Sequence, residues 1–248
     1  MYTIIIPTLQ KRLDILKKLI ENLENDSSVG EIIVINNALK PLDFEFSKLR
    51  VITKDKNLYV NPSWNLGVSE AKYDIIGLLN DDIILAPDFC TSLKNKLPEN
   101  FGVIGFGKNE VNIINDLSEP QQSEINLKET DFIELGFGIS MFFKKENYQN
   151  IPNELKIMYG DCFIFDSFKN RGFKNYKIQG QKIHHLGSLT TSGKNFNPVI
   201  INDKKIYKKL TIKPLEYIFS IKEYSDCKKL RFLGLNIKLY NKKGEYAK

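Results

Sequence analysis

An apolar run leading into paired carboxylates, Leu78-Leu79-Asn80-Asp81-Asp82-Ile83-Ile84-Leu85, constrains the fold of this chain more than any other stretch. Such a run predicts a buried strand that delivers carboxylates to its own end. Burying Asp81 beside Asp82 costs several kcal/mol unless a cation or hydrogen-bond donors compensate, and a divalent metal would do so. Asn-Asp-Asp is also good turn chemistry between two strands, so the octapeptide alone leaves both interpretations open.

Apolar β-branched runs at residues 2–6, 31–35 and 49–53 predict further buried parallel strands. Apolar residues at helical spacing predict a helix over 12–23, and a loop from Asn57 leads into a helix that ends near Lys72. This succession of strands and helices predicts an α/β chain built on an open parallel sheet.

The second half of the chain continues the pattern with weaker signals. We expect strands at 101–106, at 132–143, where glycines allow a close approach, and at 175–178, on a sheet edge. A helix that holds Phe89, Leu93 and Leu97 is expected after Asp88 as N-cap, and another over 162–169. The polar segment 108–130 is weakly periodic, which favours a mobile excursion over the site.

Polar residues follow several of the predicted strands where each strand ends. Thr8 closes the first, Asn36 and Asn37 close the second, and Asp81 and Asp82 follow the run that opened this section. Ligands of open parallel sheets bind outside the carboxyl ends of the strands. We therefore expect these side chains to converge on one crevice.

Four other polar or aromatic residues suit either a functional or a structural role. Asp161 begins a predicted helix, where an acidic residue is most often a cap. Trp64, the only tryptophan, is more typical of a core than of a ligand platform. Asn57 and Asn65 could cap turns.

The only two histidines, His184 and His185, are adjacent on a predicted strand. Neighbouring strand residues face opposite ways, so one would point into the site and the other out of it. A lone histidine is more often packed than bound to a metal, but a pair at a strand end suits a cation that an Asp-Asp pair also needs.

The net charge of +6 is unevenly distributed. From Lys204 onward there are 13 Lys and Arg against 4 Asp and Glu, a net charge of +9, which leaves −3 for the rest. A basic tail on a mildly acidic body favours an anionic surface as partner, although a solvated basic helix packed on the sheet fits equally well. The charge of the body argues against nucleic-acid binding.

The three cysteines, Cys90, Cys162 and Cys227, are widely spaced and odd in number. This pattern gives neither a disulfide framework nor a zinc motif and favours the reducing cytosol. No apolar stretch is long enough for a membrane span, and the chain starts in a strand pattern without a secretory signal.

The order of these motifs resembles the family 2 glycosyltransferases of the GT-A fold, of the type that builds bacterial surface polysaccharides. The resemblance covers about residues 1–192. It is carried by the Ile4-Ile5-Ile6-Pro7-Thr8 start, the strand 31–37, Asn57 with Trp64-Asn65-Leu66-Gly67, Asn80-Asp81-Asp82, Gly160-Asp161 with Arg171-Gly172-Phe173, and His185-Leu186-Gly187-Ser188.

The resemblance implies a GT-A (Rossmann-like), mostly parallel sheet flanked by helices over residues 1–200. The nucleotide-sugar half would span about 1–107 and the acceptor half about 131–200, before a basic amphipathic extension at 201–248. It also implies a nucleotide-diphosphate sugar donor of the UDP, dTDP or GDP type, a glycan or lipid-linked acceptor, inversion at the anomeric carbon, and Mn²⁺ or Mg²⁺. The expected location is the cytoplasm, with peripheral contact to the inner face of the membrane.

Residue roles carry over by position. Asp161 would be the catalytic base, Asp82 and His185 would bind the metal, and Asp81 would meet the ribose or a metal-bound water. The residues expected around the nucleotide sugar are Thr8, Asn36, Asn57, Trp64, Asn65, Asn80, Asp81 and Lys194. This chain has Asn36 where the family usually has Asp, Asn80 at the start of the aspartate triplet, and Gly160 where Glu is common.

Two other functions compete with transfer. A nucleotidyltransferase also uses paired carboxylates and a metal. It would need a glycine-rich phosphate loop after the first strand, and the presence of Gln10-Lys11-Arg12 there disfavours this function. The second alternative is a sugar-nucleotide or glycan-binding module that has lost catalysis. Asn36 and Asn80 favour it, because each stands where the family often has an aspartate.

Overall fold

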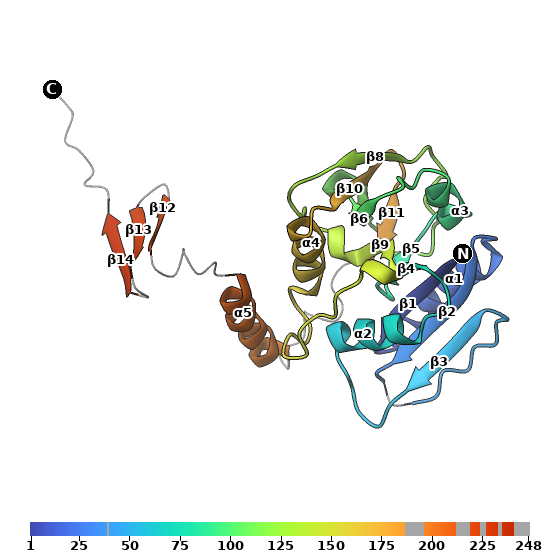
Figure 1. Ribbon diagram of the computed structural model, residues 1–248. Coiled ribbons are helices and arrows are strands. Elements are labelled where there is room, and N and C mark those ends of the chain that lie inside the picture. The colour runs from blue at the N-terminus through green and yellow to red at the C-terminus, as the bar shows by residue number, and fades with distance from the viewer. Residues whose placement is uncertain (39, 187–195, 212–218, 224–226, 233–234, 241–248) are drawn as a thin grey trace. The chain divides into compact units, whose positions relative to one another are not determined.

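The computed structural model of this chain describes residues 1–38, 40–186, 196–211, 219–223, 227–232 and 235–240 (Figure 1). The chain forms two compact units, Met1–Asp203 and Lys204–Lys248. The second contains a three-stranded antiparallel sheet of β12 (Phe219–Glu223), β13 (Cys227–Phe232) and β14 (Leu235–Tyr240), which the sequence analysis did not predict. No helix of the described residues combines the length and apolarity of a membrane span.

An eight-stranded sheet in the order β3-β2-β1-β4-β9-β6-β10-β8 is the framework of the first unit. β3, β2, β1 and β4 are parallel, β9 runs antiparallel between β4 and β6, and β10 is parallel to β6. The strands are β1 (Tyr2–Thr8), β2 (Val29–Asn36), β3 (Leu49–Thr53), β4 (Ile75–Leu79), β6 (Phe101–Phe106), β8 (Asn126–Glu129), β9 (Ser140–Lys144) and β10 (Lys174–Gln179). The predicted α/β fold with a mostly parallel sheet is confirmed.

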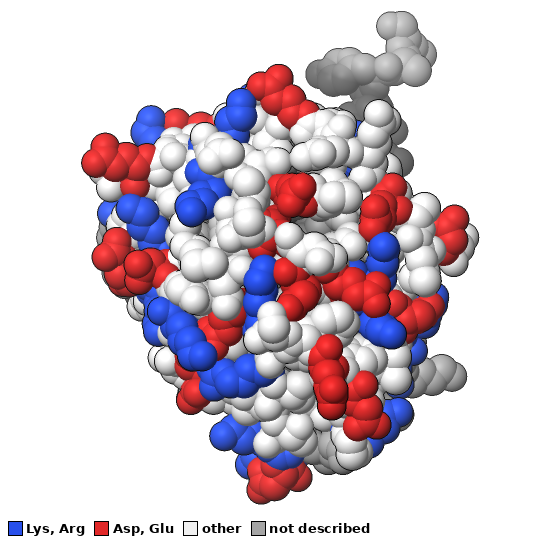
Figure 2. Space-filling view, turned by 90° about the vertical axis from the view of Figure 1, so that its right-hand side faces the viewer, with Lys and Arg blue, Asp and Glu red and all other residues white. Residues whose placement is uncertain are grey.

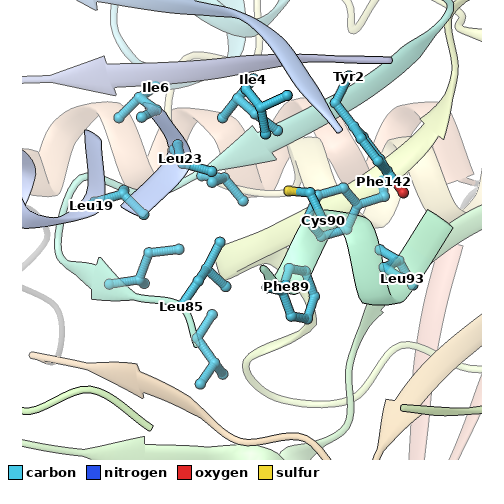
Figure 3. Packing of buried hydrophobic residues seen from close by; sticks show 14 of the residues in the cluster. Tyr2, Ile4, Ile6, Leu19, Leu23, Leu85, Phe89, Cys90, Leu93 and Phe142 are labelled. Carbon is cyan, nitrogen blue, oxygen red and sulfur yellow. The ribbon is translucent and has the colours of Figure 1, made fainter. Parts of the chain in front are cut away.

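Helices flank this sheet on both faces. They are α1 (Leu13–Asn25), α2 (Val60–Glu70), α3 (Phe89–Lys94) and α4 (Gly160–Asn170), with single 3-10 turns η1 (Lys108–Glu110), η2 (Phe137–Ile139) and η3 (Lys145–Asn147). The last helix, α5 (Asn197–Thr211), includes residues of both units. Ile4 and Ile6 of β1 share an apolar cluster with Leu19 of α1 (Figure 3). On the other face of β1, a Cβ atom at Gly67 of α2 would lie 2.3 Å from Ile5 Cγ2, so glycine is needed for this close packing.

A second sheet of three short strands determines the geometry of the site. β11 (Ile183–His185) lies between β5 (Ile83–Ile84) and β7 (Val111–Ile113), antiparallel to the first and parallel to the second. Because β5 begins directly after Asp82, its pairing with β11 brings the acidic pair beside the histidines.

Segment 108–130 differs from the expected mobile excursion. It contributes η1, β7 and β8, and β8 pairs with β10 at the edge of the large sheet. β10 is therefore an interior strand, and the prediction of an edge strand at 175–178 was wrong. Weak hydrophobic periodicity hid β7 and β8 because their side chains are mostly exposed and their pairing partners lie far along the chain.

Two local predictions also need correction. Of the strand expected over 132–143, only Ser140–Lys144 is extended, because residues 137–139 form a 3-10 turn. Asp88 makes no side-chain cap at the start of α3. Asp26 accepts the N–H groups of Cys90 and Thr91 instead, at 2.8 and 3.2 Å, so a carboxylate from another element does the capping.

Charged side chains of both signs are interspersed on the side of the molecule shown in Figure 2. Ion pairs among the described residues include Lys18–Glu119 at 2.6 Å and Arg50–Glu70 at 2.9 Å. Exposed pairs of this kind contribute at most about 1 kcal/mol each. The stability of the first unit therefore depends chiefly on the apolar core that Figure 3 shows.

Candidate active site

A cavity of about 300 Å³ opens at the carboxyl ends of β1, β2 and β4. Small-molecule sites begin at about this size, and in α/β sheets they lie at this end of the strands. The residues that line it are Pro7, Thr8, Leu9, Asn37, Asn57, Tyr59, Val60, Trp64, Asn80, Asp81, Asp82, Gly136, Gly138, Ile139, Ile157, Met158, Tyr159, Asp161, His185 and Phe196. The predicted crevice thus brings together Thr8, Asn57, Trp64, Asn80, Asp81, Asp82, Asp161 and His185.

Asp81 is held at the cavity wall by the last residue of β1. The Thr8 hydroxyl donates a hydrogen bond to Asp81 Oδ2 at 2.6 Å, and the Thr8 hydroxyl oxygen itself accepts the N–H of Gln10 at 2.8 Å. Burial raises the pKa of Asp81 to about 6, the Thr8 hydrogen bond opposes this rise, and the charge of Asp82 adds to it. Asp81 therefore changes protonation state close to neutral pH.

Asp82 and His185 form a buried pair. β5 and β11 bring the two residues together, and the N–H of Leu186 donates to the carbonyl oxygen of Asp82 at 2.9 Å. Asp82 Oδ1 lies 3.2 Å from His185 Nε2, yet neither atom makes a well-directed hydrogen bond. Two buried polar atoms that face each other without satisfying each other are suited to a shared third partner.

The chemistry of this pair fits a divalent cation. A carboxylate oxygen and an imidazole nitrogen are both common ligands of Mn²⁺ and related metals. Within the described part of the chain, no cluster of three or more His, Cys, Asp or Glu residues could hold a metal by itself. A cation bound by Asp82 and His185 would need further ligands, which substrate phosphates and water supply in many Mg²⁺ sites.

His184 occupies the other face of β11. Its Nδ1 lies 2.7 Å from the carbonyl oxygen of Ser118, and it does not line the cavity. Neighbouring strand residues face opposite ways, as the sequence predicted, and His185 is the histidine that faces the site.

Asp161 approaches the cavity from the opposite half of the sheet. It is the second residue of α4, and its Oδ1 accepts the N–H of Cys162 at 2.8 Å. The side chain packs against the backbone of Gly138, where a Cβ atom would lie 2.5 Å from Asp161 Oδ2. Burial raises the pKa of Asp161, and the Cys162 N–H partly offsets this effect. A buried carboxylate with a raised pKa is suited to proton transfer.

Asn36 does not reach the cavity. Its Oδ1 accepts hydrogen bonds from Gln10 Nε2 at 3.0 Å and from the N–H of Ala38 at 3.1 Å, and its Nδ2 donates to the carbonyl oxygen of Lys40 at 2.7 Å. The next residue, Asn37, lines the cavity instead, where its Oδ1 accepts the N–H of Leu58 at 2.9 Å. The sequence predicted that both asparagines would converge on the crevice, and only Asn37 does; two adjacent residues of the same type gave no means of choosing between them.

Asn65 also lies away from the cavity lining. Its side chain bridges the Tyr148 hydroxyl at 2.7 Å and the N–H and C=O groups of Ile151 at 3.0 and 2.8 Å, a structural role. Trp64 combines both predicted roles, because it is only 4% exposed and still contributes to the cavity wall. Asn57 Oδ1 accepts the N–H of Tyr59 at 2.7 Å. Lys194 lies outside the described residues.

Sequence reasoning missed two tyrosines on the cavity wall. Tyr59 and Tyr159 have φ angles of 67° and 65° and directly precede α2 and α4. A positive φ at a non-glycine residue costs about 1–3 kcal/mol and is often found at functional sites. No sequence signal marks these positions, because tyrosine is not a residue expected in that conformation.

Comparisons with known proteins identify a family and a fold for this chain. A family model described as Glycosyl transferase family 2 matches residues 3–172. The chain is also similar to a crystal structure of S. aureus TarS residues 1–349, with 13% identity and a TM-score of 0.53, covering 87% of this chain and 67% of that one. A longer S. aureus TarS structure gives the same identity and TM-score, but the chain spans only 41% of its length. A comparison with curated proteins gave no match.

Proposed function

The chain belongs to glycosyl transferase family 2 and has the GT-A fold, and from that premise we propose that it transfers a sugar from a nucleotide-diphosphate sugar to a hydroxyl group with inversion. One observation carries the proposal. The buried pair Asp82 and His185 and the carboxylate of Asp161 line the same cavity from two halves of the sheet. Inverting transfer needs both a stabiliser for the leaving diphosphate and a base for the acceptor.

Asp82 and His185 would hold a divalent cation, Mn²⁺ or Mg²⁺, through Oδ1 and Nε2. When bound, the cation would neutralise the negative charge that develops on the leaving diphosphate. Thr8 and Asp81 would contact the nucleotide, and Asn37, which lines the cavity, would do so in place of Asn36. Asn57, Trp64 and Asn80 complete the donor side of the cavity wall.

Asp161 would act as the general base. The acceptor hydroxyl attacks the anomeric carbon, the bond between that carbon and the diphosphate oxygen breaks, and Asp161 takes the hydroxyl proton. The raised pKa of this carboxyl supports the assignment, because a base is more effective when its pKa approaches the working pH. A single displacement of this kind inverts the configuration at the anomeric carbon.

Turnover of a donor panel tests the proposal. The full chain is incubated with UDP-glucose, UDP-N-acetylglucosamine, UDP-galactose, dTDP-rhamnose and GDP-mannose in the presence of Mn²⁺, and the released nucleotide is identified. Water takes the place of the acceptor hydroxyl in this assay, so release of nucleoside diphosphate and free sugar by the unmodified chain, and its loss in Asp161→Asn, would support transfer. Release of sugar 1-phosphate would instead indicate transfer of the nucleotidyl group.

Isothermal calorimetry with the same sugars separates transfer from simple binding. Donor binding that depends on Mn²⁺, together with nucleoside diphosphate release, supports the enzyme. Tight binding without any hydrolysis or transfer would identify a binding module and overturn the proposal. Absence of both binding and turnover for all five sugars would overturn it as well.

We also propose that the acceptor is a glycan or lipid-linked glycan and that the basic residues from Lys204 onward bring the enzyme to an anionic membrane surface. The net charge of +9 in this segment supports the proposal. Each Lys or Arg near an anionic bilayer contributes about 1 kcal/mol, so a segment of this charge would bind appreciably at physiological salt.

A further inference from the structure

Asp203 is a fully buried carboxylate to which the proposed transfer gives no role. It lies on α5 and is 0% exposed. Its Oδ1 accepts the N–H of Lys156 at 3.0 Å, and its Oδ2 accepts the N–H groups of Ile157 and Met158 at 2.8 and 2.9 Å. Three backbone donors compensate the burial of the charge, and charge-assisted hydrogen bonds of this type are stronger than neutral ones.

Helix α2 also holds the segment 156–158 that Asp203 binds. The N–H of Asn61 donates to the carbonyl oxygen of Lys156 at 3.0 Å, and Asn61 Nδ2 donates to the carbonyl oxygen of Met158 at 3.2 Å. Asn61 is also fully buried. Residues 156–158 are therefore held by polar contacts from two helices.

This segment leads directly into the site. Ile157, Met158 and Tyr159 all line the cavity, and Tyr159, with its φ of 65°, makes the turn into α4. Asp161 follows two residues later. A shift of residues 156–158 would therefore displace the turn at Tyr159 and, with it, the Asp161 carboxylate that lines the same cavity as Asp82 and His185.

We propose that Asp203 is a positioning residue, which fixes Asp161 in the cavity by holding the backbone of residues 156–158. It does not touch the cavity itself. This inference rests on the proposed function of Asp161. Misplacement of a catalytic group by about 1 Å can reduce the rate by about 100-fold, so a remote carboxylate that sets a backbone position can control turnover.

The chain offers a matched control in Asp26. This residue is 2% exposed and also accepts backbone N–H groups, from Ser28 at 2.9 Å and from Cys90 at 2.8 Å, but it does not line or border the cavity. Asp203→Asn and Asp26→Asn remove the same charge from comparable surroundings. A loss of activity from general destabilisation would affect both variants alike.

The experiment measures two properties of the full chain in both variants. Hydrogen–deuterium exchange, without any ligand, should become about tenfold faster at residues 156–160 in Asp203→Asn only. With the panel sugar that the unmodified chain turns over fastest, kcat should fall by about tenfold or more in Asp203→Asn, with the donor KM within about twofold. The pH at which kcat rises on the acidic side of its pH profile should shift in Asp203→Asn and remain unchanged in Asp26→Asn.

Three results would overturn the inference: unchanged exchange at 156–160 in Asp203→Asn, an unchanged kcat, or an equal loss of kcat in Asp26→Asn. If Asp203→Asn does not fold, Asp203→Glu takes its place, because it keeps the charge on a longer side chain, and the same readouts decide. If the unmodified chain turns over no donor, the proposed function fails on its own, and the exchange experiment still decides whether Asp203 fixes residues 156–160.

Discussion

His185 Nε2 lies 3.2 Å from Asp82 Oδ1, and both atoms are buried without a well-directed hydrogen bond. The two residues are 103 positions apart in the sequence, and the pairing of β5 with β11 brings them together. An unsatisfied buried pair costs free energy unless it has a partner such as a cation. Its persistence next to the cavity is best explained by a ligand that the pair shares.

Replacing either member of this pair should weaken metal binding. We expect Asp82→Asn and His185→Ala each to raise the Mn²⁺ concentration for half-maximal activity by about 10- to 100-fold. The double variant should be little worse than either single one, since both residues serve one site. Mn²⁺ titrations of activity and of thermal stability measure this. His184→Ala, on the opposite face of β11, is the control, and an equal effect there would contradict the assignment.

The role of Asp161 predicts a specific pH dependence. Because burial raises its pKa, the carboxyl stays protonated to a higher pH than an ordinary aspartate, and only its deprotonated form accepts a proton. kcat/KM should therefore rise with pH through that raised pKa. Asp161→Asn should reduce kcat by about 10²- to 10⁴-fold and leave donor binding intact. Asp166→Asn on the same helix should retain activity, and full turnover in Asp161→Asn would refute the assignment.

Asp81 should make the protein less stable at neutral pH than it is in mild acid. Its pKa is about 6 when folded against 3.8 ordinarily, so the folded state binds the proton more tightly. The stabilisation from that proton is complete below about pH 4 and is lost as the pH rises through 6. Asp81→Asn should then be more stable than the unmodified chain at pH 7.5 by on the order of 3 kcal/mol.

Urea denaturation at pH 7.5 and pH 4.5 tests the Asp81 prediction. The difference between the variant and the unmodified chain should shrink toward the lower pH, because both then carry a neutral side chain at this position. A constant difference at both pH values would mean that Asp81 titrates normally. Gain of stability together with loss of activity would indicate that the buried charge is kept for function.

Gly138 should tolerate no larger side chain. A Cβ atom there would lie 2.5 Å from Oδ2 and 2.7 Å from Cβ of Asp161, so the whole carboxylate would have to move. Gly138→Ala should therefore lower kcat by about 10- to 100-fold with a much smaller change in donor KM. Gly107→Ala, where the nearest atom to a new Cβ is the carbonyl oxygen of Ile178 at 3.3 Å, is the control. Normal kcat in Gly138→Ala would show that Asp161 need not occupy its observed position.

The basic residues of α5 should determine vesicle binding. Lys204, Lys205, Lys208 and Lys209 are exposed, and their replacement by Glu should reduce co-sedimentation of the full chain with phosphatidylserine vesicles by about 10-fold or more. Binding should also weaken with added salt and be absent with neutral phosphatidylcholine vesicles. Lys54→Glu with Lys56→Glu, exposed positions in the first unit, is the control. Equal binding to both kinds of vesicle would refute an electrostatic role.

Much of the fold was predictable because buried strands and amphipathic helices leave short-range patterns. The apolar runs at Tyr2–Thr8, Leu49–Thr53 and Phe101–Phe106 and the polar residues after them indicated the strands and the end of the sheet at which the cavity opens. Segments whose side chains are mostly exposed, such as β7 and β8, left no such pattern. Their pairing is a property of the assembled sheet.

The sequence by itself determined which residue types would gather at one rim of an α/β sheet, because strand direction and side-chain alternation are local properties. Tertiary structure decided which of two neighbouring residues faces the cavity, Asn37 rather than Asn36 and His185 rather than His184. It also decided which buried carboxylate holds which backbone, as with Asp203 and residues 156–158. Such contacts join segments far apart in the chain, and their geometry depends on packing at the scale of an ångström, which no local pattern records.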